Sequence, residues 1–234
     1  MNPLWTEIAA RAGAMLTPPQ HDQLSRYLEL LFSANQRMNL TRIIDREAAE
    51  VHHVGDALTM LGHIPPGKQR VADVGSGGGV PGVPLAIARP DLELVLIEST
   101  KKKALFLKSA AGELGLSNVH VSDARAEDVG RDPKWRESFD VVVVRAVGTL
   151  NWLAEWCLPL VKRGGRMLAM KGPKAAEELP AAEHAIRLVG GGSPDVHPAN
   201  LPGADNHVII EIAKTDRTPK AYPRPASIAK GKPL

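Results

Sequence analysis

A glycine-rich segment, Arg70–Pro84 (RVADVGSGGGVPGVP), constrains the fold of this chain more than any other part of its sequence. It opens with a short apolar run that contains one acid, Asp73, and continues with five glycines before a helical pattern begins. Glycine lets the backbone turn sharply and approach a ligand closely. The segment therefore predicts a strand, a tight loop and a helix N-terminus, which is how a parallel α/β sheet holds a cofactor containing adenosine.

Apolar runs and helical patterns alternate after this segment. We expect strands at 70–74, 93–98, 119–121, 139–144, 166–170 and 206–212, helices at about 81–89, 100–115 and 149–159, and a turn-rich loop at 190–203. The run FDVVVV at 139–144 is typical of a strand buried on both faces. This βαβ alternation predicts an α/β fold, with a mostly parallel sheet and helices on both of its faces.

Two regions flank the predicted core, which spans 70–214. Residues 1–69 show helical patterns at about 3–16, 20–34 and 46–61 and predict an N-terminal helical cap. Residues 215–234 form a basic tail with four prolines, and Lys230 is among its cations. Such a tail suits contact with a phosphate backbone, and a solvated chain end has the same composition.

Cysteine content and hydropathy indicate the cellular compartment in which we expect this chain. The single cysteine, Cys157, lies in an apolar stretch, so no disulfide or zinc–cysteine cluster forms within the chain, which fits a reducing cytoplasm. We find no signal peptide and no membrane span. The sequence thus predicts a cytoplasmic monomer that holds no metal.

The pattern of the glycine loop can be compared with those that bind a nicotinamide dinucleotide and those that bind S-adenosylmethionine. Gly77–Gly82 spells the dinucleotide fingerprint, but the first glycine after the strand is Gly75, and the pattern fails when counted from there. The alternative is Asp-x-Gly-x-Gly, Asp73–Gly77, in which the loop with Ser76 approaches the methionine part of S-adenosylmethionine. No pyrophosphate needs neutralising there, so Asp73 can hold a cationic ammonium. A methyltransferase is therefore favoured over a nicotinamide dehydrogenase.

Acids at the ends of the next strands fit the adenosine part of either cofactor. Glu98 ends the second strand, where a carboxylate can bond ribose hydroxyls. The segment 123–127 follows the third strand and can meet an adenine amino group, although Asp123 is equally suited to begin a helix.

Three segments carry a resemblance to a known family. DVGSGGGVPGVPLAIARP, FDVVVVRAVGTL and GGRMLAMKG, in this order, resemble the bacterial glucose-inhibited division protein B family. NLTRI (39–43), HHVGDAL (52–58) and the tail AYPRP are similar to the family's cap and basic end, so the resemblance extends from about residue 20 to 227. It implies a class I S-adenosylmethionine-dependent methyltransferase fold, Rossmann-like with an antiparallel last strand. It also implies that N7 of a guanine in 16S rRNA, free or in the small ribosomal subunit, is the target.

The resemblance also implies residue roles. Gly75 and Val80 match cofactor positions in the loop, Ala126 and Glu127 match the pair that contacts adenine, and Arg145 matches the arginine after the fourth strand. This chain departs from the family at Asn206, where many members have an arginine, so an RNA contact by that side chain stays open.

Guanine N7 carries an exposed lone pair and no proton. The predicted reaction therefore needs the guanine and the methyl donor to be held in line, and it needs no general base. Arg145 and Lys171 follow buried strands and are expected to position cofactor or target. For Arg145 the alternative is a structural ion pair with Glu127 or Asp123. Expected RNA contacts are Asn39, Arg42, Lys101, Lys102, Arg125, Lys171 and Arg224. A methyltransferase of another substrate and a non-catalytic S-adenosylmethionine- or RNA-binding protein remain the alternatives.

Overall fold

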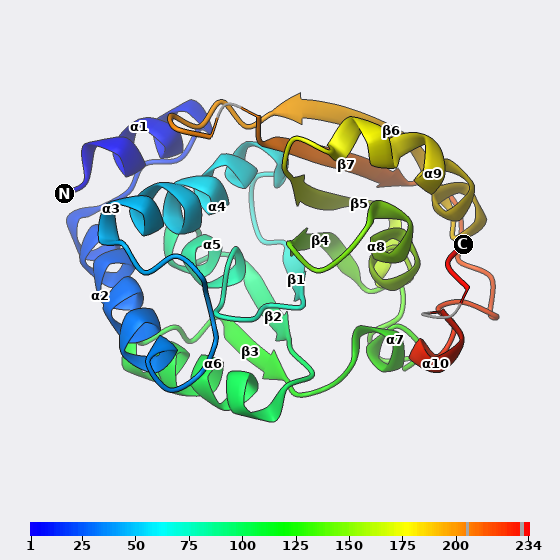
Figure 1. Ribbon diagram of the computed structural model, residues 1–234, viewed down its shortest axis with the longest axis horizontal. Coiled ribbons are helices and arrows are strands. Elements are labelled where there is room, and N and C mark those ends of the chain that lie inside the picture. The colour runs from blue at the N-terminus through cyan, green and yellow to red at the C-terminus, as the bar shows by residue number, and fades with distance from the viewer. Residues whose placement is uncertain (205, 230–231) are drawn as a thin grey trace.

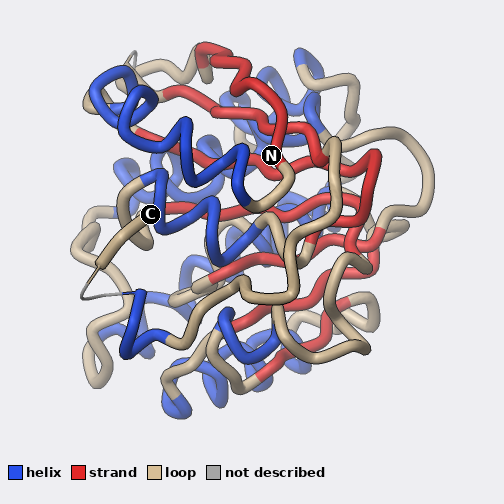
Figure 2. The backbone as a smooth tube through the Cα atoms, turned by 90° about the vertical axis from the view of Figure 1, so that its right-hand side faces the viewer, coloured by secondary structure: helices blue, strands red, loops and turns tan. Residues whose placement is uncertain are grey.

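The computed structural model describes residues 1–204, 206–229 and 232–234, so Lys230 of the basic tail lies outside the described residues. A seven-stranded sheet in the order β3-β2-β1-β4-β5-β7-β6 runs through the centre of the protein (Figures 1 and 2). The strands are β1 (Arg70–Val74), β2 (Glu93–Ile97), β3 (Val119–Ser122), β4 (Phe139–Arg145), β5 (Val161–Lys171), β6 (Gly191–Pro198) and β7 (Val208–Lys214).

Strands β1 to β5 pair in parallel, and β7 lies antiparallel to both β5 and β6. This confirms the predicted Rossmann-like fold with an antiparallel last strand. The strand order reverses between β1 and β4, and in open α/β sheets ligands bind at the carboxyl ends of strands beside such a reversal. The topology therefore places a binding site at the ends of β1 and β4.

Helices cover the two faces of the sheet separately (Figure 1). The cap helices α1 (Pro3–Arg11) and α2 (Pro18–Asn35) lie with α5 (Gly82–Ala88) and α6 (Lys101–Glu113) on one face, and α8 (Leu150–Cys157) and α9 (Ala175–Leu188) lie on the other. Alternate residues of β4 face opposite layers, since Val141 and Val143 pack with the cap and Val142 and Val144 pack with α8 and α9. The predicted burial of this strand on both faces is confirmed.

The third cap helix is irregular. Where one helix was expected, the chain forms α3 (Arg46–Ala49), a π-helix η1 (Glu50–Gly55), α4 (Asp56–Thr59) and a 3₁₀ turn η2 (Met60–His63). A π-turn is wider than an α-turn and is commonly found at functional sites. Here it contains His52 and His53, which contact the end of β4.

Three features of the C-terminal half differ from the prediction. The expected loop at 190–203 is largely strand β6, whose pairing with β7 overrides the weak strand preference of its glycines and prolines. Strand β5 is longer than predicted, and α9 was not predicted. Shorter helices are α7 (Ala126–Val129) and α10 (Ala226–Ala229). No helix in the described ranges is long and apolar enough to cross a membrane.

The C-terminal tail packs on the protein through arginines. Arg136 donates hydrogen bonds to the carbonyls of Thr218 and Tyr222, each at 2.7 Å. Arg224 forms a two-pronged ion pair with Glu155 of α8, with both N–O distances at 2.7 Å. Glu155 is 1% exposed, so Arg224 neutralises a buried charge. This geometry does not support the expected RNA contact by Arg224.

Candidate methyl-donor and base site

The glycine loop after β1 is shaped by close contacts that only glycine permits. Gly75 has a φ of +71°, and a Cβ at this position would lie 2.7 Å from the side chain of Val147. A Cβ on Gly82 would lie 2.3 Å from Leu96 and 2.7 Å from the carboxylate of Asp73. The first glycine thus gives the loop its left-handed turn, and the second lets α5 pack directly on the sheet.

Asp73 lies beneath this loop and is fully buried. Its Oδ2 accepts a hydrogen bond from the backbone N–H of Gly82 at 3.1 Å, whereas its Oδ1 has no partner among the described residues. Burial raises the pKa of Asp73 to about 7. The carboxylate ties the end of β1 to the start of α5, and it lines none of the three cavities described next. Direct contact with an ammonium group, as expected from the sequence, has no support in this geometry.

A cavity of about 290 Å³ lies beside the ends of β1 and β2. Its lining includes Glu98, Arg125, Ala126, Glu127, Trp152 and Trp156. The two indole N–H groups are buried and have no acceptor within the described part of the chain. Aromatic walls and carboxylates suit a nucleoside, so the residues fit the adenosine part of S-adenosylmethionine. Ala126 and Glu127, which the resemblance matches to an adenine-contacting pair, are among the lining residues.

Glu98 connects this cavity to the glycine loop. Its Oε2 accepts a hydrogen bond from Gly77 N–H at 2.9 Å, and its Oε1 accepts one from Thr100 N–H at 2.7 Å. These bonds fix the carboxylate in place, and each oxygen keeps a further lone pair. Glu98 is thus placed to accept hydrogen bonds from ribose hydroxyls.

A second cavity, of about 420 Å³, continues from the first and shares Gly75, Glu98, Ser99 and Val147 with it. Its lining also contains Ser76, Gly77, Val80, Thr41, His53, Lys103 and Arg145. Among the three lysines that begin α6, Lys103 lines this cavity, whereas Lys101 and Lys102 are exposed. Lys101 and Lys102, which were expected to contact RNA, do not line this cavity, and the run of three lysines did not mark Lys103 as a cavity residue.

Arg145, at the end of β4, holds a polar network in the wall of this cavity. Its guanidinium donates to Asp56 Oδ2 at 3.1 Å, to Nδ1 of His53 at 3.1 Å and to the carbonyl of His52. Both alternatives for its ion-pair partner, Glu127 and Asp123, are therefore wrong. The true partner lies in the cap, which the sequence does not place next to β4.

His53 is neutral in this network. Its burial, together with the nearby charge of Arg145, lowers its pKa to about 4. Because Arg145 donates to Nδ1, the proton resides on Nε2, which lies 2.9 Å from the hydroxyl of Thr41. His53 thus orients Arg145 rather than taking up protons near neutral pH.

Asp56 also binds His207, which precedes β7. The Nδ1 of His207 lies 3.0 Å from Asp56 Oδ1, and this hydrogen bond raises the pKa of His207. Asp56 thereby joins Arg145 to His207 across the site. In the sequence, Asp56 lay within the segment 52–58 that carries the family resemblance, and neither Asp56 nor His207 was expected as a site residue.

A third cavity, of about 480 Å³, begins at Arg145 and Ala146, which it shares with the second. Its other lining residues are Asp56, Met170, Lys171, Gly172, Pro173, Lys174, Glu178 and His207. Lys171 Nζ lies 2.7 Å from Glu178 Oε2 and donates to the carbonyl of Gly148 at 2.8 Å. The three cavities form a series, and the third combines apolar walls with a few fixed polar groups, as small planar ligands require.

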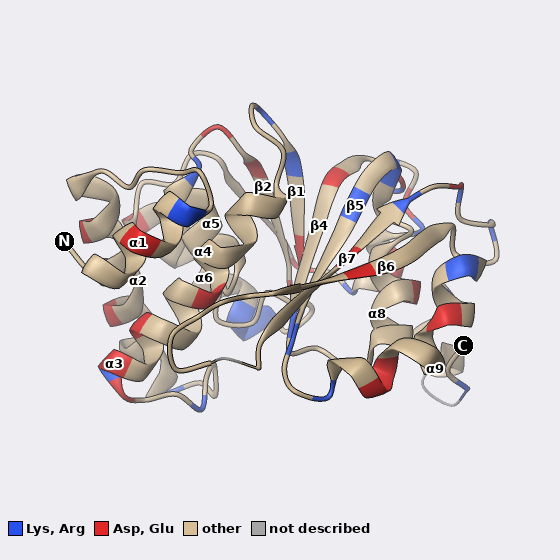
Figure 3. Cartoon of the chain, turned by 90° about the horizontal axis from the view of Figure 1, so that it is seen from above, with Lys and Arg blue, Asp and Glu red and all other residues tan. Residues whose placement is uncertain are grey.

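The remaining candidates for RNA contact lie on the surface. Asn39, Arg42, Lys101, Lys102 and Arg125 are exposed, as is Asn206. Lysine and arginine are interspersed with acids around the protein rather than gathered on one element (Figure 3). Charge alone therefore does not define an RNA-binding face.

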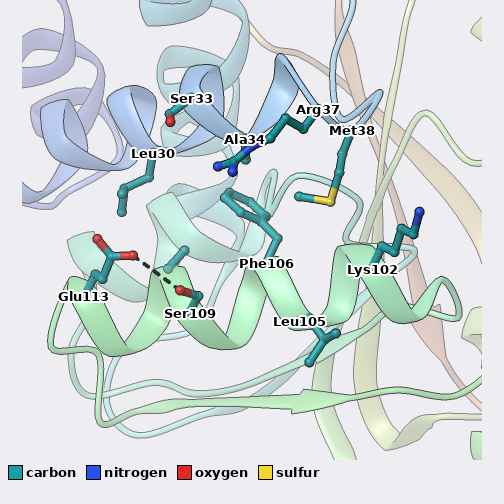
Figure 4. A pocket seen from close by; sticks show the side chains of 11 residues that line it. Leu30, Ser33, Ala34, Arg37, Met38, Lys102, Leu105, Phe106, Ser109 and Glu113 are labelled. Carbon is teal, nitrogen blue, oxygen red and sulfur yellow. Dashed lines mark hydrogen bonds between the residues drawn. The ribbon is translucent and has the colours of Figure 1, made fainter.

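A separate apolar cavity of about 410 Å³ lies between α2 and α6 (Figure 4). In this view Phe106 lies in the middle with the guanidinium of Arg37 above it, and Leu30 and Met38 lie on opposite sides. It shares no lining residue with the other three cavities, so it is not part of this site.

Comparison with known proteins agrees with this arrangement. Residues 20–202 match the family model described as GidB, rRNA small subunit methyltransferase G. The chain is 44% identical over 225 residues to ribosomal RNA small subunit methyltransferase G of Moorella thermoacetica, covering 95% of this chain and 93% of that protein. It is 39% identical to the protein of the same name from Lactobacillus johnsonii, over the full length of both.

Solved structures with little sequence similarity share the fold. One is a 16S rRNA N2 G1207 methyltransferase of T. Thermophilus in complex with AdoMet and guanosine (TM-score 0.52, 17% identity), matched over 74% of this chain and 41% of that longer chain. Another is a putative S-adenosyl-L-methionine-dependent methyltransferase from Methanococcus maripaludis (TM-score 0.54, 14% identity), matched over 73% of this chain and 90% of that chain.

Proposed function

This chain belongs to the rRNA small subunit methyltransferase G family, and we propose that it transfers the methyl group of S-adenosylmethionine to N7 of a guanine in 16S rRNA. The observation that carries this proposal is the series of three cavities, which share Glu98 at the first junction and Arg145 at the second. Adenosine fits the first, the methionine part fits the second, and a base fits the third.

S-adenosylmethionine, when bound, supplies a methyl group on a positively charged sulfur. The chain's own task is to place the guanine so that the N7 lone pair lies in line with that methyl group. The titratable groups at the junction are already engaged, His53 with Arg145 and Thr41, and Asp56 with Arg145 and His207. Since N7 carries no proton, this arrangement is consistent with a reaction that needs no general base.

Polar groups in the third cavity can orient a base. The carboxylates of Asp56 and Glu178 line it together with the cations Arg145, Lys171 and Lys174, and each carboxylate is paired with one of these cations. The Oε2 of Glu178 already accepts hydrogen bonds from Lys171 and from the backbone N–H of Leu150, which leaves its Oε1 as an acceptor for an N–H of guanine. Lys171 keeps a donor for O6.

Exposed polar residues would hold the RNA around the opening. Asn39 and Arg42 on the cap, Lys101 and Lys102 on α6, and Arg125 before α7 are proposed to contact phosphates or bases. One chain lines all three cavities, which suits a monomer, and we propose that the enzyme acts in the cytoplasm on 16S rRNA or on the small subunit.

The test uses purified protein, labelled S-adenosylmethionine, and 16S rRNA or small subunits from cells that lack this gene. We expect label at one guanine and cleavage there by chemistry specific for N7-methylguanine. Label on an exocyclic amine would assign a different substrate atom. Cofactor binding without transfer to either RNA substrate would favour the non-catalytic alternative.

A further inference from the structure

Two histidines and a glutamate converge on the cap face of the sheet, outside the three cavities. His63 ends η2, His197 lies in β6 and Glu211 lies in β7. His63 Nδ1 lies 3.1 Å and His197 Nε2 lies 3.8 Å from Glu211 Oε2. Each residue offers one ligand atom within 4.8 Å of the others. We propose that these three side chains form a binding site for a divalent transition metal ion such as Zn²⁺.

The spacing of these atoms suits tetrahedral coordination. Zinc bonds to imidazole nitrogen and carboxylate oxygen are about 2.0–2.2 Å long, which places neighbouring tetrahedral ligands roughly 3.4 Å apart. The two measured separations lie on either side of this value, so small rotations of the side chains bring all three ligands onto one ion. Two histidines and one glutamate with an open fourth position are an established zinc ligand set.

The surroundings of Glu211 support the same conclusion. Arg166 lies 2.6 Å from Glu211 Oε1, whereas both histidine contacts are to Oε2. Such an outer partner fixes the orientation of a ligating carboxylate, and here it leaves Oε2 for the ion. The side chains of His63 and Glu211 are 21% and 18% exposed, whereas that of His197 is 41% exposed. The site is therefore shielded on the protein side and open to a water ligand on the other.

Both imidazoles approach the same oxygen of Glu211, Oε2, while Arg166 binds the other oxygen. In the tautomers that leave these two nitrogens unprotonated, both nitrogen lone pairs and Oε2 converge, and a divalent cation uses all three together. Bound there, it would tie the end of the cap to the β6–β7 hairpin. The prediction that the chain holds no metal considered cysteines and did not include these histidines, which only the fold brings together.

The experiment titrates metal-free, full-length protein with Zn²⁺ by calorimetry and with Co²⁺ by visible absorption, which reports tetrahedral coordination. We expect one ion per chain. At a Zn²⁺ concentration of about 100 times Kd, Tm should rise by roughly 5–10 °C. His197→Gln and Glu211→Gln should each weaken binding more than about 100-fold, beyond what loss of an outer partner does. The matched control is His184→Gln, because His184 is exposed on α9 and outside the cluster.

Two results would overturn the site. One is no uptake of Zn²⁺ by the wild-type protein below millimolar concentration. The other is uptake that stays unchanged in both His197→Gln and Glu211→Gln, which would place the ion elsewhere. Circular dichroism of the metal-free variants establishes that they fold, so that lost binding is assigned to lost ligands.

Discussion

Arg145 and Asp56 lie 89 residues apart in the sequence and meet through an N–O contact of 3.1 Å, which joins the end of β4 to the cap. The side chain of Asp56 is 2% exposed and that of Arg145 is 18% exposed. Because this ion pair is shielded from water, its two side chains keep a fixed position. They thereby define the wall where the second cavity meets the third. The cap is thus part of the wall of the reaction site.

Two substitutions at Arg145 should separate its contribution to the stability of the fold from its role in positioning the reacting groups. Arg145→Ala leaves Asp56 buried with only His207 as a charged partner, and we expect a loss of about 3–5 kcal/mol in unfolding free energy. Arg145→Lys keeps the charge but lacks the planar fork that reaches Asp56, His53 and the His52 carbonyl. We expect it to fold and to lose about 100-fold or more in methyl transfer, with donor affinity changed little.

The control for both variants is Arg187→Ala, which removes an exposed ion pair with Glu183 on α9. It should leave the unfolding free energy within about 0.5 kcal/mol of wild type. Urea unfolding, donor titration and single-turnover transfer provide the measurements. Wild-type transfer by Arg145→Lys would exclude the positioning role.

Gly75→Ala should impair donor binding. The new Cβ meets Val147 at 2.7 Å and the residue must also keep a φ of +71°. Gly67→Ala is the matched control, because Gly67 has a φ of +77° and a Cβ there meets nothing within 4 Å. Both variants carry the backbone strain, and only Gly75→Ala displaces the cavity wall. Calorimetric titration with S-adenosylhomocysteine should show weakening of about tenfold or more for Gly75→Ala alone, and equal weakening in both would contradict the steric explanation.

The buried neutral His53 makes stability depend on pH. Its folded pKa of about 4 lies below the ordinary value of 6.5, so between these values the unfolded chain binds a proton that the folded chain does not. Stability from this group therefore falls as the pH drops from 6.5 to about 4, by about 3 kcal/mol in total.

Comparison of wild type with His53→Gln isolates this contribution. Asp73, whose pKa is raised to about 7, acts in the opposite direction, since its folded form retains a proton that the unfolded chain releases. Asp73 is present in both wild type and His53→Gln, so its contribution cancels when the two unfolding free energies are subtracted. The difference in unfolding free energy between the two proteins should grow with pH from about 4 to 6.5. A difference independent of pH would show that His53 is not buried as described.

The tryptophans of the first cavity should report the donor. Trp152 and Trp156 have ring centroids 5.6 Å apart and unpaired indole N–H groups. S-adenosylhomocysteine should change tryptophan fluorescence in wild type and in Trp135→Phe, but not in the Trp152→Phe, Trp156→Phe double variant. A full signal from the double variant would place the adenosine elsewhere.

Arg224→Ala should destabilise the protein although its position lies in the basic tail. Removal of the guanidinium leaves Glu155 buried and unpaired, which costs about 3–5 kcal/mol. Glu155→Gln in the same chain should restore part of that loss, and Arg217→Ala, at an exposed position, should be neutral. If Arg224→Ala instead weakened RNA binding at unchanged stability, the tail would act as the sequence analysis expected.

The sequence predicted the features that depend on local patterns. The Asp73–Gly77 loop, the valine-rich β4 and the alternation of strands and helices follow from glycine positions and hydrophobic periodicity, and the fold class is confirmed. The cofactor type follows from the same loop.

Long-range pairing accounts for the features that were missed. Asp56 and His207 contact each other from opposite ends of the chain, and no local pattern marks either as a partner of the other. Strand β6 exists because β7 offers it an edge, against the composition of its own residues. Arg224 looks like a free cation in the sequence because its partner, Glu155, lies 69 positions away.

The contact between Arg224 and Glu155 also has a consequence for folding during synthesis. Translation delivers the carboxylate on α8 69 positions before its cationic partner. Until Arg224 has been added and can fold back, a nascent chain carries this acid without its guanidinium in the layer between the sheet, α8 and α9.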